Sequence, residues 1–172
     1  MPPTKPSTNS IALAGEFAVL SQLALRGYDA NLTLGNTKGV DILVSDPESG
    51  EMYRLEVKTK YHKNGKAVVK SPFWGHSCGW MMSEKHETLI DPKLYYCFVN
   101  LLAGPHPSFQ FFVVPSAVVA PYVRKQHLLW LKADPSHKDT KMRTFRLAVA
   151  DDGYPLPTPP AAEYEDAWDF GG

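Results

Sequence analysis

Residues 39–60 read GVDILVSDPESGEMYRLEVKTK, and this stretch decides the fold. A turn centred between Glu48 and Ser49 predicts an antiparallel hairpin with three apolar pairs: Val40 with Val57, Ile42 with Leu55, and Val44 with Tyr53. Because side chains alternate along a strand, these pairs share one face of the sheet. The hairpin therefore buries one apolar row.

The same register places Asp41 opposite Glu56 on the other face, and Lys58 points the same way. Directly opposed side chains have Cβ atoms about 4.5–5.5 Å apart, and two carboxylates at that separation repel each other. A cation between them removes the repulsion, and Mg²⁺ binds to one or two carboxylates together with water and phosphate oxygens. The alternative is a solvated sheet face on which Arg54, Glu56, Lys58 and Lys60 simply alternate.

Around the hairpin the pattern predicts further elements. A helix is expected from Ser10 to Arg26, with Gly27 as its stop and an apolar stripe of Leu13, Phe17, Leu20 and Ala24. A short strand is expected over residues 28–34. Residues 61–79 are expected to form a loop, because lysines, glycines and Pro72 interrupt any periodic pattern.

The second half of the chain predicts a short helix that begins at Ser83 and ends before Pro92. Two buried strands follow, LYYCFVNLL (residues 94–102) and FQFFVVP (residues 109–115), since both runs are short, aromatic and β-branched. A helix over residues 116–131 is expected to restart at Pro121, and residues 141–149 are expected to form a late edge strand.

A helix glutamate, then Gly-x-Asp on one strand, then Glu-x-Lys on the next is the order of AGEFAVLSQLALRGY, GVD and EVK here. This order resembles the PD-(D/E)xK nuclease superfamily, and most closely its small Holliday-junction-resolvase and Mrr-type members. The resemblance covers residues 10–131, and Val40 stands where the named motif has proline. It implies an α/β, restriction-endonuclease-like fold, a central mixed sheet flanked by helices in the order αβββαββα.

By motif, the resemblance implies that Asp41 and Glu56 hold a metal ion, that Lys58 is the catalytic lysine, and that Glu16 is an accessory ligand. The implied activity is metal-dependent hydrolysis of phosphodiester bonds, in DNA rather than RNA, with Mg²⁺ as cofactor and Mn²⁺ able to substitute. The alternative is an inactive nuclease-fold module that binds nucleic acid or a protein. A homodimer would suit paired cuts in two strands.

A basic run follows the hairpin, and it contains Lys60, Lys63, Lys66 and Lys70, with Trp74 just beyond. Lysines bind phosphates and aromatic rings stack on exposed bases, so this run is a candidate nucleic-acid contact. The alternative is a lysine-rich surface loop whose aromatic residues cover the edge of the sheet. A basic helical segment with Arg124, Lys125 and His127 is a weaker candidate of the same kind.

The formal net charge is zero, but the last stretch holds six acids and no base, which leaves residues 1–150 with 12 acids against 18 bases. A mildly basic body of this kind is compatible with a polyanionic partner. We therefore divide the chain into an N-terminal segment (residues 1–9), a single nuclease-like domain (10–150), and an acidic, proline-rich tail (151–172) expected to be extended. The tail is a candidate surface for a protein partner.

Other classes of protein fit the composition less well. No apolar run reaches the ~18 residues of a membrane span, and no signal peptide precedes the first helix, so a cytoplasmic protein with reduced cysteines is expected. The histidines and cysteines that invite a zinc site match no metal-binding spacing: His62, His76, Cys78, His86 and Cys97. No glycine-rich phosphate loop supports a small-molecule enzyme.

Overall fold

The computed structural model describes residues 5–33, 39–150 and 152–171. In chain order its elements are α1 (Thr8–Leu25), β1 (Asp29–Leu32), β2 (Ile42–Ser45), β3 (Met52–His62), β4 (Val69–Ser71), β5 (Gly75–Ser83), the 3₁₀-helix η1 (Glu84–Glu87), β6 (Leu94–Leu102), β7 (Ser108–Pro115), α2 (Ser116–Ala133), β8 (Met142–Ala148) and α3 (Ala161–Tyr164).

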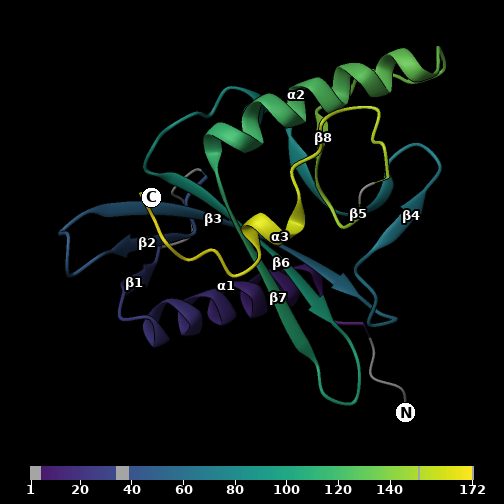
Figure 1. Ribbon diagram of the computed structural model, residues 1–172. Coiled ribbons are helices and arrows are strands. Elements are labelled where there is room, and N and C mark those ends of the chain that lie inside the picture. The colour runs from purple at the N-terminus through teal and green to yellow at the C-terminus, as the bar shows by residue number, and fades with distance from the viewer. Residues whose placement is uncertain (1–4, 34–38, 151, 172) are drawn as a thin grey trace.

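The larger sheet has five strands in the order β1-β2-β3-β6-β7. Neighbouring strands are antiparallel except β3 and β6, which are parallel. The helices α1 and α2 lie on opposite sides of β6 and β7 (Figure 1). The chain is therefore an α/β protein with a mixed sheet flanked by helices, and the predicted class is confirmed.

The central strand β6 explains why both faces of this sheet are covered. Eight of its nine residues are buried, as expected for a strand in the middle of a sheet. Tyr95, Cys97 and Val99 pack toward α1, and Tyr96 and Phe98 pack toward the other layer. The two faces of the sheet thus carry two separate apolar clusters.

A second sheet of three strands, in the order β4-β5-β8, forms that other layer together with α2. Trp80 of β5 packs against Phe98 of β6, with ring centroids 5.0 Å apart, and Phe145 of β8 stacks on the same ring at 4.5 Å. The prediction of a loop over residues 61–79 therefore holds for residues 63–68 and 72–74 and is wrong for the end of β3, for β4 and for the start of β5. Although lysines and glycines mask the pattern, Ser77 and Cys78 are buried, and pairing with β8 turns this segment into a strand.

The hairpin register is as predicted: Ile42 pairs with Leu55 and Val44 pairs with Tyr53. All four side chains are buried beside α1. This register fixes which side chains of β3 belong to the core and which face the second layer.

The face of α1 that packs on the sheet differs from the expected one. The buried residues are Ile11, Gly15, Val19 and Leu23, whereas Leu13 and Phe17 of the predicted stripe are 48% and 58% exposed. Apolar residues occur on most sides of this helix, so periodicity alone could not select the face. Gly15 selects it, because a Cβ at that position would lie 1.8 Å from Thr59 Oγ1 of β3.

Several element boundaries also differ from the prediction. The cap of α1 is Ser7, whose side chain accepts a hydrogen bond from Ser10 N. The helix expected after Ser83 is only the four-residue η1. α2 is continuous through Pro121 and does not restart there. The predicted end of the first strand, Leu34, lies outside the described residues.

The C-terminal segment is packed, and the expectation of an extended tail is wrong for residues 161–170. Ala161 begins the short helix α3 and is buried, Trp168 is 3% exposed, and Phe170 stacks on Tyr53 with ring centroids 5.2 Å apart. The acidic and proline-rich composition hid these aromatic anchors. They cover the cluster beside α1, so the charged residues of the segment end up on the surface.

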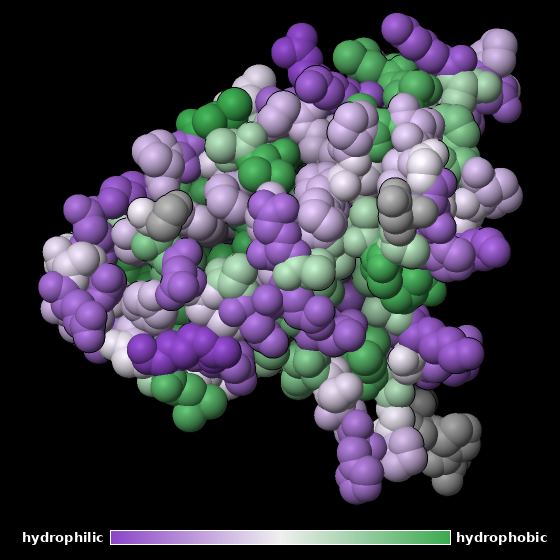
Figure 2. All heavy atoms as spheres, viewed as in Figure 1, coloured by the Kyte–Doolittle hydropathy of each residue, from purple (hydrophilic) through white to green (hydrophobic). Residues whose placement is uncertain are grey.

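The visible face of the molecule is mostly hydrophilic (Figure 2). On the face viewed in Figure 2, apolar residues form small separate groups among hydrophilic ones. Among the described residues, no helix has both the length and the apolar character needed to span a membrane.

Candidate functional site

Asp41 lies where β2 begins, just beyond the last ladder pair. Its N–H donates to Leu55 O at 2.8 Å although Ile42 is the ladder partner of Leu55, and its Oδ2 accepts a hydrogen bond from Val57 N at 2.7 Å. The Asp41 carboxylate thus accepts the hydrogen bond of a β3 backbone N–H, as the carbonyl of a neighbouring strand would. The hairpin holds Asp41 half-buried beside Glu56, although the two residues do not form the directly opposed ladder pair that the sequence predicts.

Glu56 is the most deeply buried acid of the site, with its side chain 3% exposed. It pairs in register with Tyr96, so it points into the second layer and away from α1. Its Oε1 lies 2.5 Å from Lys58 Nζ and 3.0 Å from His86 Nε2. Its Oε2 is buried and has no hydrogen-bond partner among the described residues. One oxygen of the carboxylate is therefore engaged by Lys58 and His86, and the described part of the chain leaves the other without a partner.

His86 was missed as a site residue because 30 positions separate it from Glu56 and its spacing fits no motif. The ring is buried in η1, and its Nδ1 accepts a hydrogen bond from Ser83 N at 3.0 Å. In the neutral ring the proton is then on Nε2, which donates to Glu56. The sequence feature that points to this region is Ser83, since the helix predicted to begin there corresponds to η1, which carries His86.

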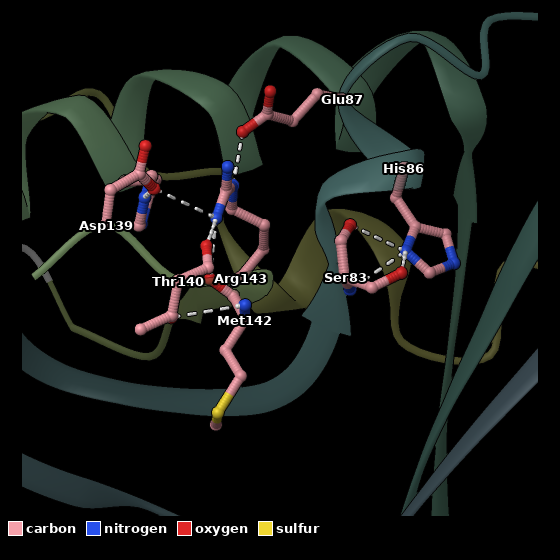
Figure 3. Close-up of polar contacts among 8 residues, drawn as sticks. Ser83, His86, Glu87, Asp139, Thr140, Met142 and Arg143 are labelled. Atoms are coloured by element: carbon pink, nitrogen blue, oxygen red, sulfur yellow. Dashed lines mark hydrogen bonds and ion pairs between the residues drawn. The ribbon is translucent and has the colours of Figure 1, made fainter.

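The second sheet anchors η1. Arg143 of β8 is buried and forms an ion pair with Glu87, the last residue of η1 (Figure 3). Its guanidinium also donates to Met142 O at 2.9 Å and lies 3.9 Å from Asp139, which pairs with His127 of α2 at 2.7 Å. The position of His86 against Glu56 therefore depends on contacts from β8 and α2.

Lys58 and Lys85 bring positive charge to the solvent side of Glu56. Lys85 Nζ lies 3.7 Å from Glu56 Oε1, and the Lys85 side chain is 52% exposed, compared with 26% for Lys58. A ligand that approaches from solvent would meet these two amines before it meets the buried carboxylate. Neither Lys85 nor His86 lies in a sequence motif that would mark it as a site residue.

Glu16 reaches the same region from α1. Gly15, immediately before it, allows the helix to touch β3 at Thr59. The half-buried Glu16 carboxyl has a raised pKa because burial disfavours its charge, and because the negative charge of Asp41 lies close by; Lys58 partly offsets both effects. The structure thus brings Glu16, Asp41 and Lys58 within electrostatic reach of one another.

The pKa values of Asp41 and Glu56 are shifted in opposite directions, although burial acts to raise both. Burial raises the pKa of Asp41, and the Val57 N–H and the charge of Lys58 only partly offset this, while Glu56 adds repulsion. Burial alone would also raise the pKa of Glu56, but the hydrogen bond from His86 and the Lys58 amine outweigh it and lower the pKa to about 2. Glu56 is therefore ionised at neutral pH, and Asp41 carries a charge that lacks full compensation.

The carboxylate oxygens of Glu16, Asp41 and Glu56 are ligands that suit a hard cation needing few protein ligands. Oε2 of Glu56 is a carboxylate oxygen without a hydrogen-bond partner in the described part of the chain, and a Cβ at Gly39 would lie in contact with it, 3.4 Å away. Within residues 5–33, 39–150 and 152–171, no group of three or more His, Cys, Asp and Glu side chains is placed to enclose an ion. The residues fit Mg²⁺, which keeps several waters, better than a metal held by protein alone.

The predicted nucleic-acid residues are placed unequally. Lys63, Lys66 and Lys70 are exposed, whereas Lys60 is half-buried and donates to Gly79 O at 2.8 Å. Trp74 is 7% exposed, with the Arg146 guanidinium 5.0 Å from its ring centroid. Stacking of Trp74 on an exposed base is therefore contradicted, because the ring already belongs to the protein interior.

The histidines and cysteines considered for zinc are dispersed. Cys78 and Cys97 are both buried free thiols, His62 bonds to Asn100 at 2.9 Å, and His76 bonds to Asp152 at 2.6 Å. Burial raises the pKa of both thiols, so neither is activated as a nucleophile.

Comparisons with known proteins add little to this geometry. No family model and no curated protein matches the chain. Among solved structures, a bacterial homing endonuclease, I-Ssp6803I, matches with a TM-score of 0.45 and 15% identity over 94% of this chain and 90% of that chain. A similarity of this size establishes neither a shared fold nor a shared activity.

Proposed function

We propose that this chain is a Mg²⁺-dependent nuclease of the restriction-endonuclease-like, PD-(D/E)xK type that hydrolyses phosphodiester bonds in DNA. The observation that carries the proposal is the state of Glu56. It is buried and ionised, with one oxygen held by Lys58 and His86 and the other without a hydrogen-bond partner among the described residues, in the electrostatic field of Asp41. A purely structural carboxylate would satisfy both of its oxygens.

Asp41 and Glu56 would hold the ion, with Glu16 as an accessory ligand. When bound, Mg²⁺ would neutralise charge on the phosphate and polarise the phosphorus–oxygen bonds. Mn²⁺ prefers the same oxygen ligands and is expected to substitute. The charge of the ion would also compensate Asp41, whose buried carboxylate has only partial compensation from the protein.

Lys58 would act on the reacting phosphate. Its contact with Glu56 Oε1 fixes the amine next to the acid while a quarter of the side chain stays exposed. An amine in that position can donate hydrogen bonds to phosphate oxygens as their negative charge grows in the transition state. Lys85 is more exposed and would contact the same phosphate group before reaction.

His86 would keep Glu56 in place. Because Nε2 donates to Oε1, the histidine would fix the orientation of the carboxylate and leave Oε2 without a partner among the described residues. His86 would thus be a positioning residue. The ion pair between Arg143 and Glu87 holds η1, which carries His86, against β8. Lys63, Lys66 and Lys70 are exposed on the segment after β3 and would contact the nucleic-acid backbone.

A second candidate is a nuclease-fold module that binds nucleic acid without cleaving it. The Glu56–Lys58 contact at 2.5 Å favours this alternative, because it already neutralises the acid in the absence of an ion. The two candidates differ in whether the Glu56 carboxylate exchanges part of this pairing for a cation.

The test is a panel of duplex, branched and single-stranded DNA and of RNA, incubated with Mg²⁺, with Mn²⁺ or with chelator. Wild-type protein is expected to cleave at least one DNA form only when the ion is present. Lys58→Ala is expected to lower the cleavage rate by ~10²–10³-fold, the usual effect of removing one donor to developing charge. The exposed Lys132 on α2 supplies the control variant Lys132→Ala, which should cleave like wild type.

Binding without ion-dependent cleavage of any form would favour the non-catalytic module. Equal cleavage by wild type and Lys58→Ala would remove Lys58 from the mechanism.

A further inference from the structure

Two arginines on β8, three positions apart, have opposite surroundings. Arg143 is buried and has acidic partners in Glu87 and Asp139. Arg146 is half-buried, and among the described residues no ion pair includes it. Its Nε is buried and has no hydrogen-bond partner in the described part of the chain. The charge of Arg143 is therefore compensated by acids within the fold, whereas the described residues supply no acid for Arg146.

Lys60 meets Arg146 at Gly79. Gly79 of β5 pairs directly with Arg146, and a Cβ on Gly79 would lie 3.2 Å from Arg146 Nη1. Lys60 Nζ donates to the carbonyl oxygen of the same glycine at 2.8 Å. Two cationic side chains from two different sheets thus converge on one residue that has no side chain of its own.

In the described part of the chain, no acidic side chain forms an ion pair with Lys60 or Arg146 at this point. Burial lowers the pKa of Lys60, and the neighbouring charge of Arg146 lowers it further. Burial also lowers the pKa of Arg146. Half-buried cations without an acid are costly unless an anion joins them.

The geometry of Arg146 leaves donors free for such an anion. Its guanidinium carbon lies over the ring of Trp74, 5.0 Å from the centroid. The N–H donors of a guanidinium lie in its plane and match the oxygens of a phosphate. The cation–π contact with Trp74 therefore holds the guanidinium in place while its N–H groups can still bind an anion.

We propose that Lys60 and Arg146 bind a phosphate group of a nucleic-acid backbone. Glu56, Lys58 and Lys60 alternate along one face of β3, and a strand rises about 3.3 Å per residue, so Lys60 lies roughly 7 Å beyond Lys58 and about 13 Å beyond Glu56. A strand held at Glu56 and Lys58 would thus reach the Lys60–Arg146 site with a neighbouring phosphate. This placement rests on the proposed nuclease function, whereas the anion site itself does not.

The test measures binding in the presence of chelator, where no metal-dependent cleavage occurs. The fluorescence anisotropy of labelled single-stranded and duplex DNA is titrated with the full chain at several salt concentrations. Loss of one phosphate contact makes the slope of log K against log salt less negative by about 1. Arg146→Gln and Lys60→Gln are each expected to show this change, and the control Lys132→Gln is not.

Arg146→Lys keeps the charge but loses the planar donors, and it is expected to weaken binding less than Arg146→Gln. It also serves if Arg146→Gln does not fold, which thermal melting reports. Unchanged affinity and slope in both Arg146 variants and in Lys60→Gln would overturn the site. A melting temperature that inorganic phosphate raises in wild type but not in Arg146→Gln, with DNA binding unchanged, would assign the site to a free anion and equally overturn the proposal.

The two proposals fail separately. Altered slopes without any cleavage in the panel would retain the anion site and reject the nuclease, and ion-dependent cleavage with unaltered slopes would do the reverse.

Discussion

The two faces of β3 show how one strand serves both the core and the site. Tyr53, Leu55 and Val57 form a buried apolar row that α1 and the C-terminal segment cover. Glu56, Lys58 and Lys60 form a charged row on the other face, and it becomes more exposed beyond Glu56. The neighbouring β6 is apolar on both faces apart from Asn100. A charged row next to that strand contributes little apolar packing, and the proposed function gives it a chemical role.

Removal of Trp168 tests the apolar row. The ring is 3% exposed in the cluster that contains this row, and Trp→Ala in a core typically costs about 3–5 kcal/mol. Trp168→Ala should lower the free energy of unfolding by that amount in urea titrations. The neighbouring Asp169 is exposed, so Asp169→Ala should change it little. Equal stability of the two variants would mean that the C-terminal segment is not part of the core.

Glu56→Gln tests the charged row through its pH dependence. The pKa of Glu56 is lowered from 4.5 to about 2, so its ionised form stabilises the fold above about pH 4.5, and that contribution is lost as the pH falls toward 2. At about 1.4 kcal/mol per pKa unit, the free energy of unfolding of wild type relative to Glu56→Gln should fall by up to about 3 kcal/mol across this range.

Asp41 supplies a control of opposite sign. Its pKa is raised in the folded state, so its ionised form destabilises the fold, and this cost disappears as the pH falls. The free energy of unfolding of wild type relative to Asp41→Asn should therefore rise with falling pH. The same sign of pH dependence for both residues would contradict the environments described for them.

Gly15→Ala tests the approach of α1 to β3. In an exposed helix, Gly→Ala stabilises by about 1 kcal/mol, because alanine has the higher helix propensity. Here the new Cβ would lie 1.8 Å from Thr59 Oγ1, and overpacking of this kind costs about 1–3 kcal/mol. Thermal and urea unfolding should show destabilisation. An increase in stability would mean that α1 does not depend on contact at Gly15.

Local patterns predicted the parts of the fold that depend on local chemistry. The hairpin register follows from Ile42, Leu55 and their neighbours, because alternation along a strand leaves few alternatives. The two aromatic strands β6 and β7 follow from composition in the same way. Asp41, Glu56 and Lys58 were found by spacing within that hairpin, and the structure brings them into one electrostatic environment.

Contacts between distant segments could not be predicted from those patterns. His86 reaches Glu56 from η1, which the ion pair between Arg143 and Glu87 links to β8, and nothing in SEKHE indicates that contact. The second sheet forms because β8, far along the chain, pairs with residues 77–83. The buried face of α1 depends on one close approach to Thr59, and the docking of Trp168 depends on a cluster built from five other elements.

The charged row of β3 is most directly tested by binding of Mn²⁺, followed by electron paramagnetic resonance and calorimetry in the absence of nucleic acid. Wild-type protein should bind the ion at a site that Asp41→Asn abolishes, while Asp169→Asn, an exposed acid far from β3 in sequence, should bind it like wild type. Absence of Mn²⁺ binding by wild type, or equal binding by Asp41→Asn, would contradict a cation site between Asp41 and Glu56.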